Sequence, residues 1–208
     1  LGVMSVTPDK DEIRENQAES NAHRWGKQIF FMGISILGIG LFWMQKDHYK
    51  AYQKWNKAQM FYNNKAYEAA LEVYEPLYPL LKHKPEFLFE AAQSLSKTGR
   101  YEKANEYLER AILLSSDPML YYVMAKNEQC LGEYRQAEKH LLHAIDILPE
   151  RIYPYYLLMN LYTEPSYFQP AKLKMAIDSV LTKKPKVESS AIKEMKEKAR
   201  SMLNNTSI

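Results

Sequence analysis

The sequence is poor in several residue types on which whole classes of protein depend. It has a single cysteine, Cys130, in 208 residues, so no intrachain disulfide can form and the redox compartment stays open. Only seven glycines occur, and those at positions 33, 38 and 40 lie close together, which leaves little support for strands or for glycine-rich phosphate loops. The net charge is only +3, and lysines alternate with glutamates, which argues against nucleic-acid binding. These scarcities favour an all-α protein.

Patterns typical of catalysis and metal binding are also missing. The sequence contains no Gly-x-Ser-x-Gly, no P-loop and no dinucleotide-binding pattern. His140 and His143 lie one turn apart on a predicted helix, but no cysteine or pair of carboxylates completes a metal-binding set, so we interpret them as part of an exposed helical face. We therefore expect no catalytic residue, no metal site and no cofactor in this chain.

A short pattern that recurs three times is the most informative feature. A turn is followed by a tyrosine and, three residues later, by an alanine, at positions 65–70, 99–104 and 132–137. The tyrosines, Tyr67, Tyr101 and Tyr134, lie 34 and 33 residues apart. This spacing is typical of tetratricopeptide repeats, in which helical hairpins stack into a solenoid that holds partners.

Other positions of the repeat agree with this interpretation. Alanine recurs where closely packed helices would cross, and proline recurs near the end of each second helix, which it cannot continue. An ordinary helix bundle with coincidental spacing is the alternative. The recurring residues are Ala58, Ala92 and Ala125 on the first helices, Ala70, Ala104 and Ala137 on the second helices, and Pro85, Pro118 and Pro149 after them.

A fourth unit has an altered turn, and a final helix follows it. Helices predicted over 152–162 and 171–182 are joined by residues 163–170, which contain two prolines. The segment 188–203 carries an apolar stripe and a charged opposite face, as a capping helix requires. The sequence thus predicts a solenoid of about four units over 46–185 and a capping helix with a tail over 186–208.

An apolar segment precedes the first repeat. Residues 28–45 contain no ionisable group and, as a helix, span about 27 Å, close to the thickness of the hydrocarbon core. Trp25 and Trp43 lie where an interfacial aromatic belt would be. A secretory signal and a buried helix fit less well, because the leader 1–27 is long and charged. We predict a single transmembrane helix, whose sidedness is not set because lysines and arginines flank it equally.

The first helices of the repeats offer a candidate binding surface. Their fifth positions carry aromatic rings and their ninth positions carry amides and one lysine, a combination suited to an extended peptide or sugar polymer. The alternative is that the rings pack between repeats. Related repeats that bind carboxylate tails have a basic residue at the fifth position and an asparagine at the ninth position of the first unit. This chain has Trp55 and Gln59 there, so that class of partner is not expected. The candidate residues are Trp55, Phe89, Tyr122 and Tyr156, with Gln59, Gln93, Lys126 and Asn160.

Four stretches resemble a known family. They are Tyr-Gln-Lys-Trp at 52–55, Asp-Pro-Met-Leu-Tyr at 117–121, Arg-Ile-Tyr-Pro-Tyr-Tyr-Leu-Leu at 151–158 and Lys-Pro-Lys-Val-Glu-Ser-Ser-Ala-Ile-Lys-Glu-Met at 184–195. Together they resemble the C-terminal extension of bacterial O-antigen polymerase/ligase-like membrane proteins. The resemblance implies a repeat domain that faces the periplasm from the inner membrane, and catalytic residues that lie in a multi-spanning part outside this chain.

The first residues fit this resemblance. The chain opens on Leu-Gly-Val-Met-Ser-Val, which we expect to be the end of a preceding membrane helix, with residues 7–27 as a loop. Two functions then remain open. The chain is either a membrane-tethered scaffold that recruits protein partners, or the accessory domain of a polymerase or ligase of surface polysaccharide.

Overall fold

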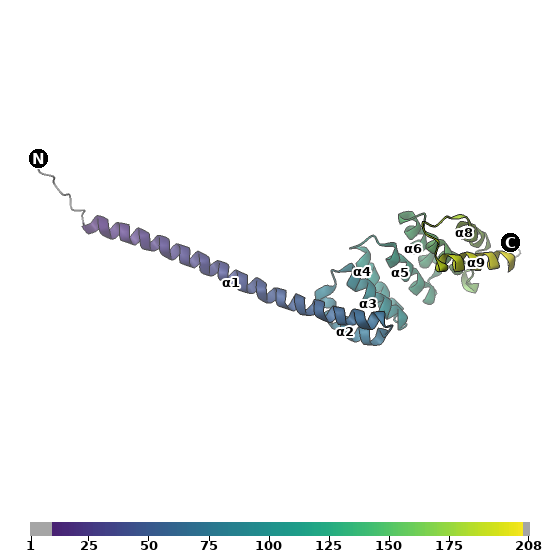
Figure 1. Cartoon of the computed structure of the whole chain (residues 1–208), viewed down its shortest axis with the longest axis horizontal. Coiled ribbons are helices and arrows are strands. Elements are labelled where there is room, and N and C mark those ends of the chain that lie inside the picture. Colours follow the sequence, from purple (N-terminus) through teal and green to yellow (C-terminus); the bar gives the residue numbers. More distant parts are fainter. Residues whose placement is uncertain (1–9, 206–208) are drawn as a thin grey trace, which may run out of the picture. The chain divides into compact units, whose positions relative to one another are not determined.

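The structure, a computed structural model, describes residues 10–205, and the regular elements in that range are all helices (Figure 1). The predicted end of a preceding membrane helix at 1–6 lies outside the described residues. The elements are α1 (Lys10–Asn63), α2 (Tyr67–Leu81), α3 (Pro85–Lys97), α4 (Tyr101–Ile112), α5 (Pro118–Cys130), α6 (Tyr134–Ile147), α7 (Tyr153–Leu161), the short 3₁₀ helix η1 (Pro165–Tyr167), α8 (Pro170–Thr182) and α9 (Ser190–Asn205).

The chain divides into two units, residues 1–50 and 51–208. In the first unit, α1 contains the one stretch among the described residues that is long and apolar enough to cross a membrane. None of its most apolar window is buried inside the protein, and Phe30, Leu37 and Phe42 are each more than 60% exposed. This stretch, Lys27–Asn63, contains the whole predicted span 28–45. The predicted domain boundaries themselves stay predictions.

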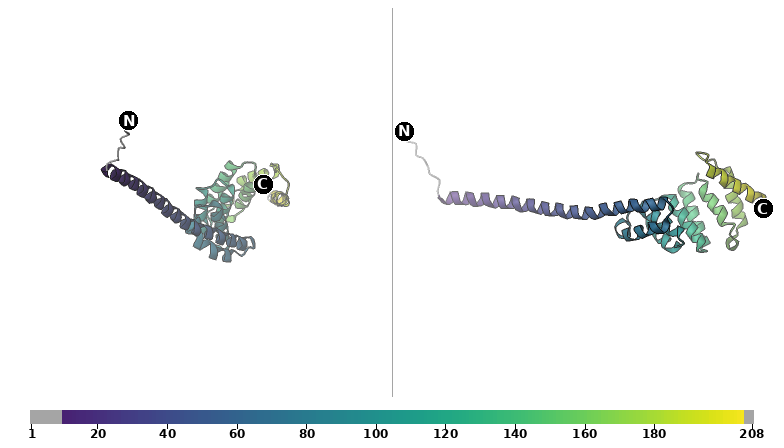
Figure 2. Two further views of the ribbon diagram at one scale, coloured as in Figure 1. Left: turned by 60° about the vertical axis from the view of Figure 1, so that its left-hand side comes forward. Right: turned by 60° about the horizontal axis from the view of Figure 1, so that its bottom comes forward.

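The second unit is a stack of helical hairpins. The last turns of α1, from Ala51, and then α2 begin this stack (Figure 2). After them, the helices with the most extensive mutual contacts are α3 with α4, α5 with α6 and α7 with α8. Each second helix also packs on the first helix of the next hairpin. Helix α9 packs on α8 and α7, the relation that a fifth first helix would have. The all-α repeat architecture predicted from the sequence is therefore confirmed.

The alanines that define the repeat lie in its core. Small side chains let the helix backbones approach closely, and larger side chains such as Tyr74 and Leu108 fill the space between them, both fully buried. Two clusters of buried residues form this core, and Ile112 packs against both. The six predicted alanines, Ala58, Ala92, Ala125, Ala70, Ala104 and Ala137, are all at most 2% exposed.

The turns inside the first three units share one backbone feature. Gly99 and Gly132 have φ angles of +78° and +77°, and Lys65, at the equivalent place in the first unit, has a φ angle of +60°. Glycine adopts this left-handed conformation without steric cost, which explains its recurrence before the tyrosine. Two of the three predicted prolines do not end a second helix. Pro85 and Pro118 instead begin α3 and α5, where the first helical residue needs no N–H donor.

Candidate functional site

The candidate site is the first-helix face, which we define as the surface of α1 from Ala51 together with α3, α5 and α7. In its first half, a carboxylate joins two units. Glu90 on α3 accepts hydrogen bonds from Trp55 Nε1 at 2.7 Å and from Gln59 Nε2 at 2.8 Å, both on α1. The Tyr74 hydroxyl donates a third bond at 3.0 Å, and burial together with Glu90 raises the pKa of Tyr74. Trp55 and Gln59 are therefore held in place by the next unit.

The same half contains Phe89 and Gln93. The Phe89 side chain is partly buried against the first core cluster, and Gln93 accepts a hydrogen bond from the Tyr62 hydroxyl. The four predicted residues here thus combine packing between units with partial exposure. The interpretation as packing between repeats applies to the buried parts of these side chains, and ligand contact at their exposed parts stays a prediction.

In the second half of the face, tyrosine rings and lysines gather on α5 and α7. Tyr122 is only 5% exposed and meets the Tyr153 ring edge to face, with centroids 5.2 Å apart. Tyr156 stacks on Tyr153 at 6.5 Å and remains partly exposed. The ammonium of Lys126 lies 5.5 Å from the Tyr153 ring, and that of Lys198 lies 5.4 Å from the Tyr156 ring. Tyr122 therefore serves packing in the free chain, whereas Tyr156 and Lys126 face outward.

Asn160 differs from the other predicted residues in its hydrogen bonding. Its side chain is partly exposed, yet its Oδ1 atom is buried and has no hydrogen-bond partner. An unsatisfied acceptor of this kind is uncommon in folded proteins and costs about 1–3 kcal/mol. Because this oxygen is buried, a ligand N–H reaches it only after the amide has rotated it toward the surface.

A carboxylate that the sequence did not single out, Glu138, also joins neighbouring elements. Glu138 on α6 accepts hydrogen bonds from the hydroxyl of Tyr162 at 2.6 Å, the hydroxyl of Tyr167 at 2.7 Å and the ammonium of Lys172 at 2.7 Å. Burial by itself would raise the pKa of Glu138, but these three donors outweigh it and hold that pKa below its ordinary value. No local pattern marks Glu138, because its partners lie 24 to 34 residues away.

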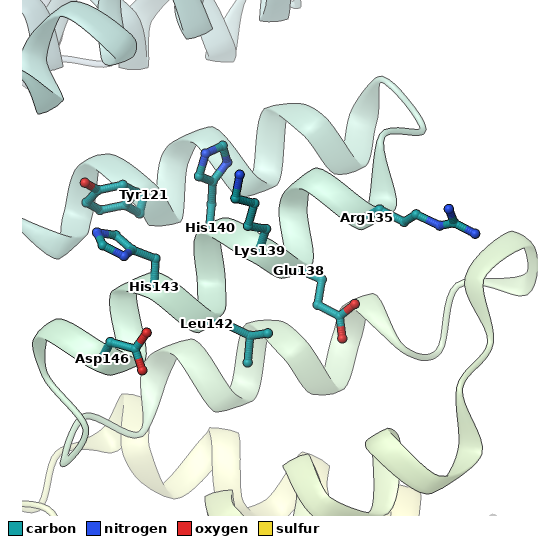
Figure 3. A pocket seen from close by; sticks show the side chains of 8 residues that line it. All are labelled: Tyr121, Arg135, Glu138, Lys139, His140, Leu142, His143 and Asp146. Carbon is teal, nitrogen blue, oxygen red and sulfur yellow. The ribbon is translucent and has the colours of Figure 1, made fainter.

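His140 is the other residue whose surroundings differ from expectation. Its Nδ1 atom lies 2.8 Å from Oε2 of Glu128, which is almost completely buried on α5. The His143 ring instead meets the Tyr121 ring at 4.7 Å (Figure 3). The interpretation of both histidines as an exposed face therefore holds for His143 and is wrong for His140. No group of three potential metal ligands was found among the described residues.

Two hollows are present outside the first-helix face. One, of about 420 Å³, lies over α6 and is lined by Tyr121, His143 and charged side chains (Figure 3). The other, of about 810 Å³, lies between residues 132–136 and 165–169. The second hollow exists because the fourth unit has its longer turn.

Comparisons with known proteins support the repeat interpretation. The sequence pattern of the family described as anaphase-promoting complex, cyclosome, subunit 3, matches residues 63–144. A crystal structure of MamA protein superposes with a TM-score of 0.59 at 16% identity, covering 74% of this chain and 88% of MamA. This chain has a tetratricopeptide-like repeat fold.

Two further solved structures share the tetratricopeptide-like fold. MamA from residue 41 onward, from Desulfovibrio magneticus RS-1, has 19% identity and a TM-score of 0.59, covering 76% of this chain and 98% of that one. The repeats of a putative kinesin light chain from Podospora anserina have 15% identity and a TM-score of 0.56, covering 76% and 88%. No curated protein matches the sequence. At these identities the likeness concerns the fold.

Proposed function

We propose that this chain is a membrane-anchored interaction domain whose first-helix face binds an extended segment of a protein partner. The observation that carries the proposal is Asn160, whose Oδ1 atom is a buried acceptor without a donor, one turn of α7 after the partly exposed Tyr156. Extended peptides present backbone N–H groups at regular intervals, so they supply the missing donor. A small rotation of the terminal amide presents the oxygen, because this torsion is soft in asparagine.

The rest of the face suits the same kind of ligand. Tyr156 and Phe89 offer apolar ring surface at low cost in conformational entropy, and Gln93 offers an amide. Glu90 fixes Trp55 and Gln59 before any ligand arrives, which lowers the entropy lost on binding. The face is therefore ordered in advance at one end and has an unfilled acceptor at the other.

The test uses the full chain in detergent micelles and an array of extended peptides of varied sequence. We expect Asn160→Ala to weaken binding of the selected peptides by about tenfold, the equivalent of about 1.4 kcal/mol. The same substitution removes an unsatisfied buried acceptor, so the thermal midpoint should stay the same or rise. Met175→Ala, which truncates a side chain 70% exposed on α8, is the matched control.

Two outcomes decide the proposal. Binding that Asn160→Ala weakens while the thermal midpoint is kept supports a ligand on the first-helix face. If the array yields no binder, or if Asn160→Ala and Met175→Ala bind alike, this function is refuted. Binding of neutral oligosaccharides in a parallel assay, with no peptide bound, would show that the ligand is a sugar polymer.

The anchor is the second part of the proposal. The anchor is supported by the length and composition of the apolar stretch of α1 and by the absence of buried residues in its most apolar window. Trp25 and Trp43 are 66% and 63% exposed, and the Lys46 ammonium lies 5.0 Å from the Trp43 ring. Aromatic rings next to lysine are typical of the membrane interface.

A second candidate function is that of an accessory domain in the assembly of surface polysaccharide. The observation that favours it is the set of four stretches at 52–55, 117–121, 151–158 and 184–195, which resemble the C-terminal extension of O-antigen polymerase/ligase-like proteins. On this proposal the repeats lie in the periplasm at the bacterial inner membrane. A reading frame upstream that encodes many membrane helices would support it, and a start codon close to Leu1 would refute it.

A further inference from the structure

The long turn of the fourth unit is fixed to the third unit. Glu164 accepts a hydrogen bond from Gln129 Nε2 at 2.6 Å, and the Tyr167 hydroxyl donates to Glu138 at 2.7 Å. The Tyr167 ring also stacks on Tyr134, with centroids 5.6 Å apart and planes inclined by 19°. Three contacts to α5 and α6 therefore order a segment that the prolines already stiffen.

This fixed turn forms one wall of the 810 Å³ hollow, and residues 132–136 form the other. Drug-sized ligands occupy hollows of about 300–1,000 Å³, so the volume is sufficient for a short segment of chain. Phe168, on the wall, is 51% exposed although the contacts around it hold the turn in place. An aromatic side chain presented in this way by an ordered backbone is a feature of recognition surfaces.

The lining has a definite chemistry. Its charged side chains are Glu133 and Arg135, one of each sign, so it favours a ligand with little net charge. Phe168 supplies exposed ring surface, and the Tyr134 and Tyr167 rings, which stack on each other, add only the surface that this contact leaves uncovered. Hydrogen-bond donors come from the guanidinium of Arg135 and from the amides of Gln136 and Gln169.

We propose that this hollow binds a proline-rich segment of a protein partner in the polyproline II conformation. Such segments have no internal hydrogen bonds, so their carbonyls are free to accept from the arginine and glutamine donors, and their proline rings pack on aromatic side chains. The inference rests on the proposed function, in which the domain binds protein segments. It assigns a second site, formed by the turns between helices and separate from the first-helix face.

The experiment measures fluorescence anisotropy of labelled Pro-x-x-Pro peptides, with the x positions randomised, on the full chain in detergent micelles. The same pool with alanine in place of proline is the peptide control. We expect the proline pool to bind and Phe168→Ala to raise its Kd about tenfold, as for an aromatic anchor at an interface. Met175→Ala and Asn160→Ala should leave the Kd within about twofold, since neither side chain lines the hollow.

The variants separate this inference from the proposed function. If Asn160→Ala weakens binding and Phe168→Ala does not, the pool occupies the first-helix face, and the second site is refuted while the proposed function stands. Binding that depends on Phe168 alone supports the second site whatever happens at the first. Equal binding of the alanine pool, or displacement by a neutral oligosaccharide, overturns the assignment to proline-rich chains.

Discussion

Lys65, Gly99 and Gly132 occupy equivalent turns, and their φ angles are all positive, between 60° and 78°. A side chain in this left-handed region costs about 1–2 kcal/mol through contact of its Cβ with the backbone. A Cβ added to Gly132 would meet no other atom within 4 Å, so backbone strain is the whole cost there. The first unit bears this cost at Lys65, and the second and third units avoid it.

We therefore predict opposite effects for two substitutions. Gly132→Ala should lower the free energy of unfolding by about 1 kcal/mol. Lys65→Gly should raise it by less, because part of the relieved strain is offset by the greater entropy of glycine in the unfolded chain. Urea unfolding followed by circular dichroism measures both. Lys65→Ala, which keeps the strain, is the control and should leave stability unchanged; a gain with that variant would mean that the lysine side chain is the cause.

At the residue scale, the buried positions were predictable and their hydrogen bonds were not. Alanine at 58, 92 and 125 must be buried in any stack of this period, because close helix crossings exclude larger side chains. The bonds of Glu90 join residues 16 to 35 positions apart, and they depend on how one unit is rotated on the next. Tyr122 and Tyr156 occupy the same position in their repeats, yet Tyr122 is buried and Tyr156 is partly exposed. The difference depends on Tyr153 and the other side chains packed around each ring, which the repeat pattern does not specify.

Several elements depend on one carboxylate. Glu138 on α6 holds the end of α7 through Tyr162, the long turn through Tyr167 and α8 through Lys172. The three donors stabilise the ionised carboxylate more than burial destabilises it, so its pKa in the folded chain is below the ordinary value of 4.5. These bonds are strongest while Glu138 carries its charge.

The sign of the pH dependence follows from this lowered pKa. The contribution of Glu138 is fully present well above pH 4.5 and is lost as the pH falls from that value through the lower pKa of the folded chain. Glu138→Gln should therefore reduce stability at neutral pH and make the decline in acid shallower. Urea unfolding at a series of pH values measures this, with Glu109→Gln on α4, an exposed position, as the control. Parallel pH profiles for the wild type and Glu138→Gln would contradict it.

The elements themselves could largely be predicted from the sequence. Helices expected over 152–162, 171–182 and 188–203 correspond to α7, α8 and α9, because periodic apolar residues determine which face of a helix is buried. The prolines were placed less well. They were expected to end second helices. Pro149 does lie just after α6, which ends at Ile147, but α2 and α4 end at Leu81 and Ile112, and Pro85 and Pro118 begin the next helices. The hollow beside η1 could not be predicted, because it depends on contacts between two turns distant in sequence.

At the scale of the whole molecule, the two units differ in whether their apolar side chains are buried. Residues 51–208 bury their own apolar side chains in two clusters, whereas the apolar stretch of α1 buries none of its most apolar window. An apolar surface of that length is unfavourable in water and favourable in a bilayer. The repeats and the apolar stretch of α1 can therefore be altered separately.

We predict that Ile36→Arg combined with Leu37→Arg releases the full chain from membranes. Each arginine near the centre of a span costs about 3 kcal/mol of insertion free energy. Sedimentation after an alkaline carbonate wash measures the released fraction, and circular dichroism should still show the helical repeats. The control is Leu113→Arg combined with Leu142→Arg, which adds the same charge at exposed positions of the repeats and should stay in the pellet. If wild type and both variants partition alike, α1 is not the anchor.

The carboxylates between units also bear on how such a chain can evolve. Glu90 takes its donors from the unit before it, and Glu138 takes its donors from the unit after it. If the second and third units exchanged places, both carboxylates would lose these donors and be left partly desolvated. The order of the units is thus fixed by their interfaces, and recombination that shuffles units would be selected against even where each hairpin keeps its alanines.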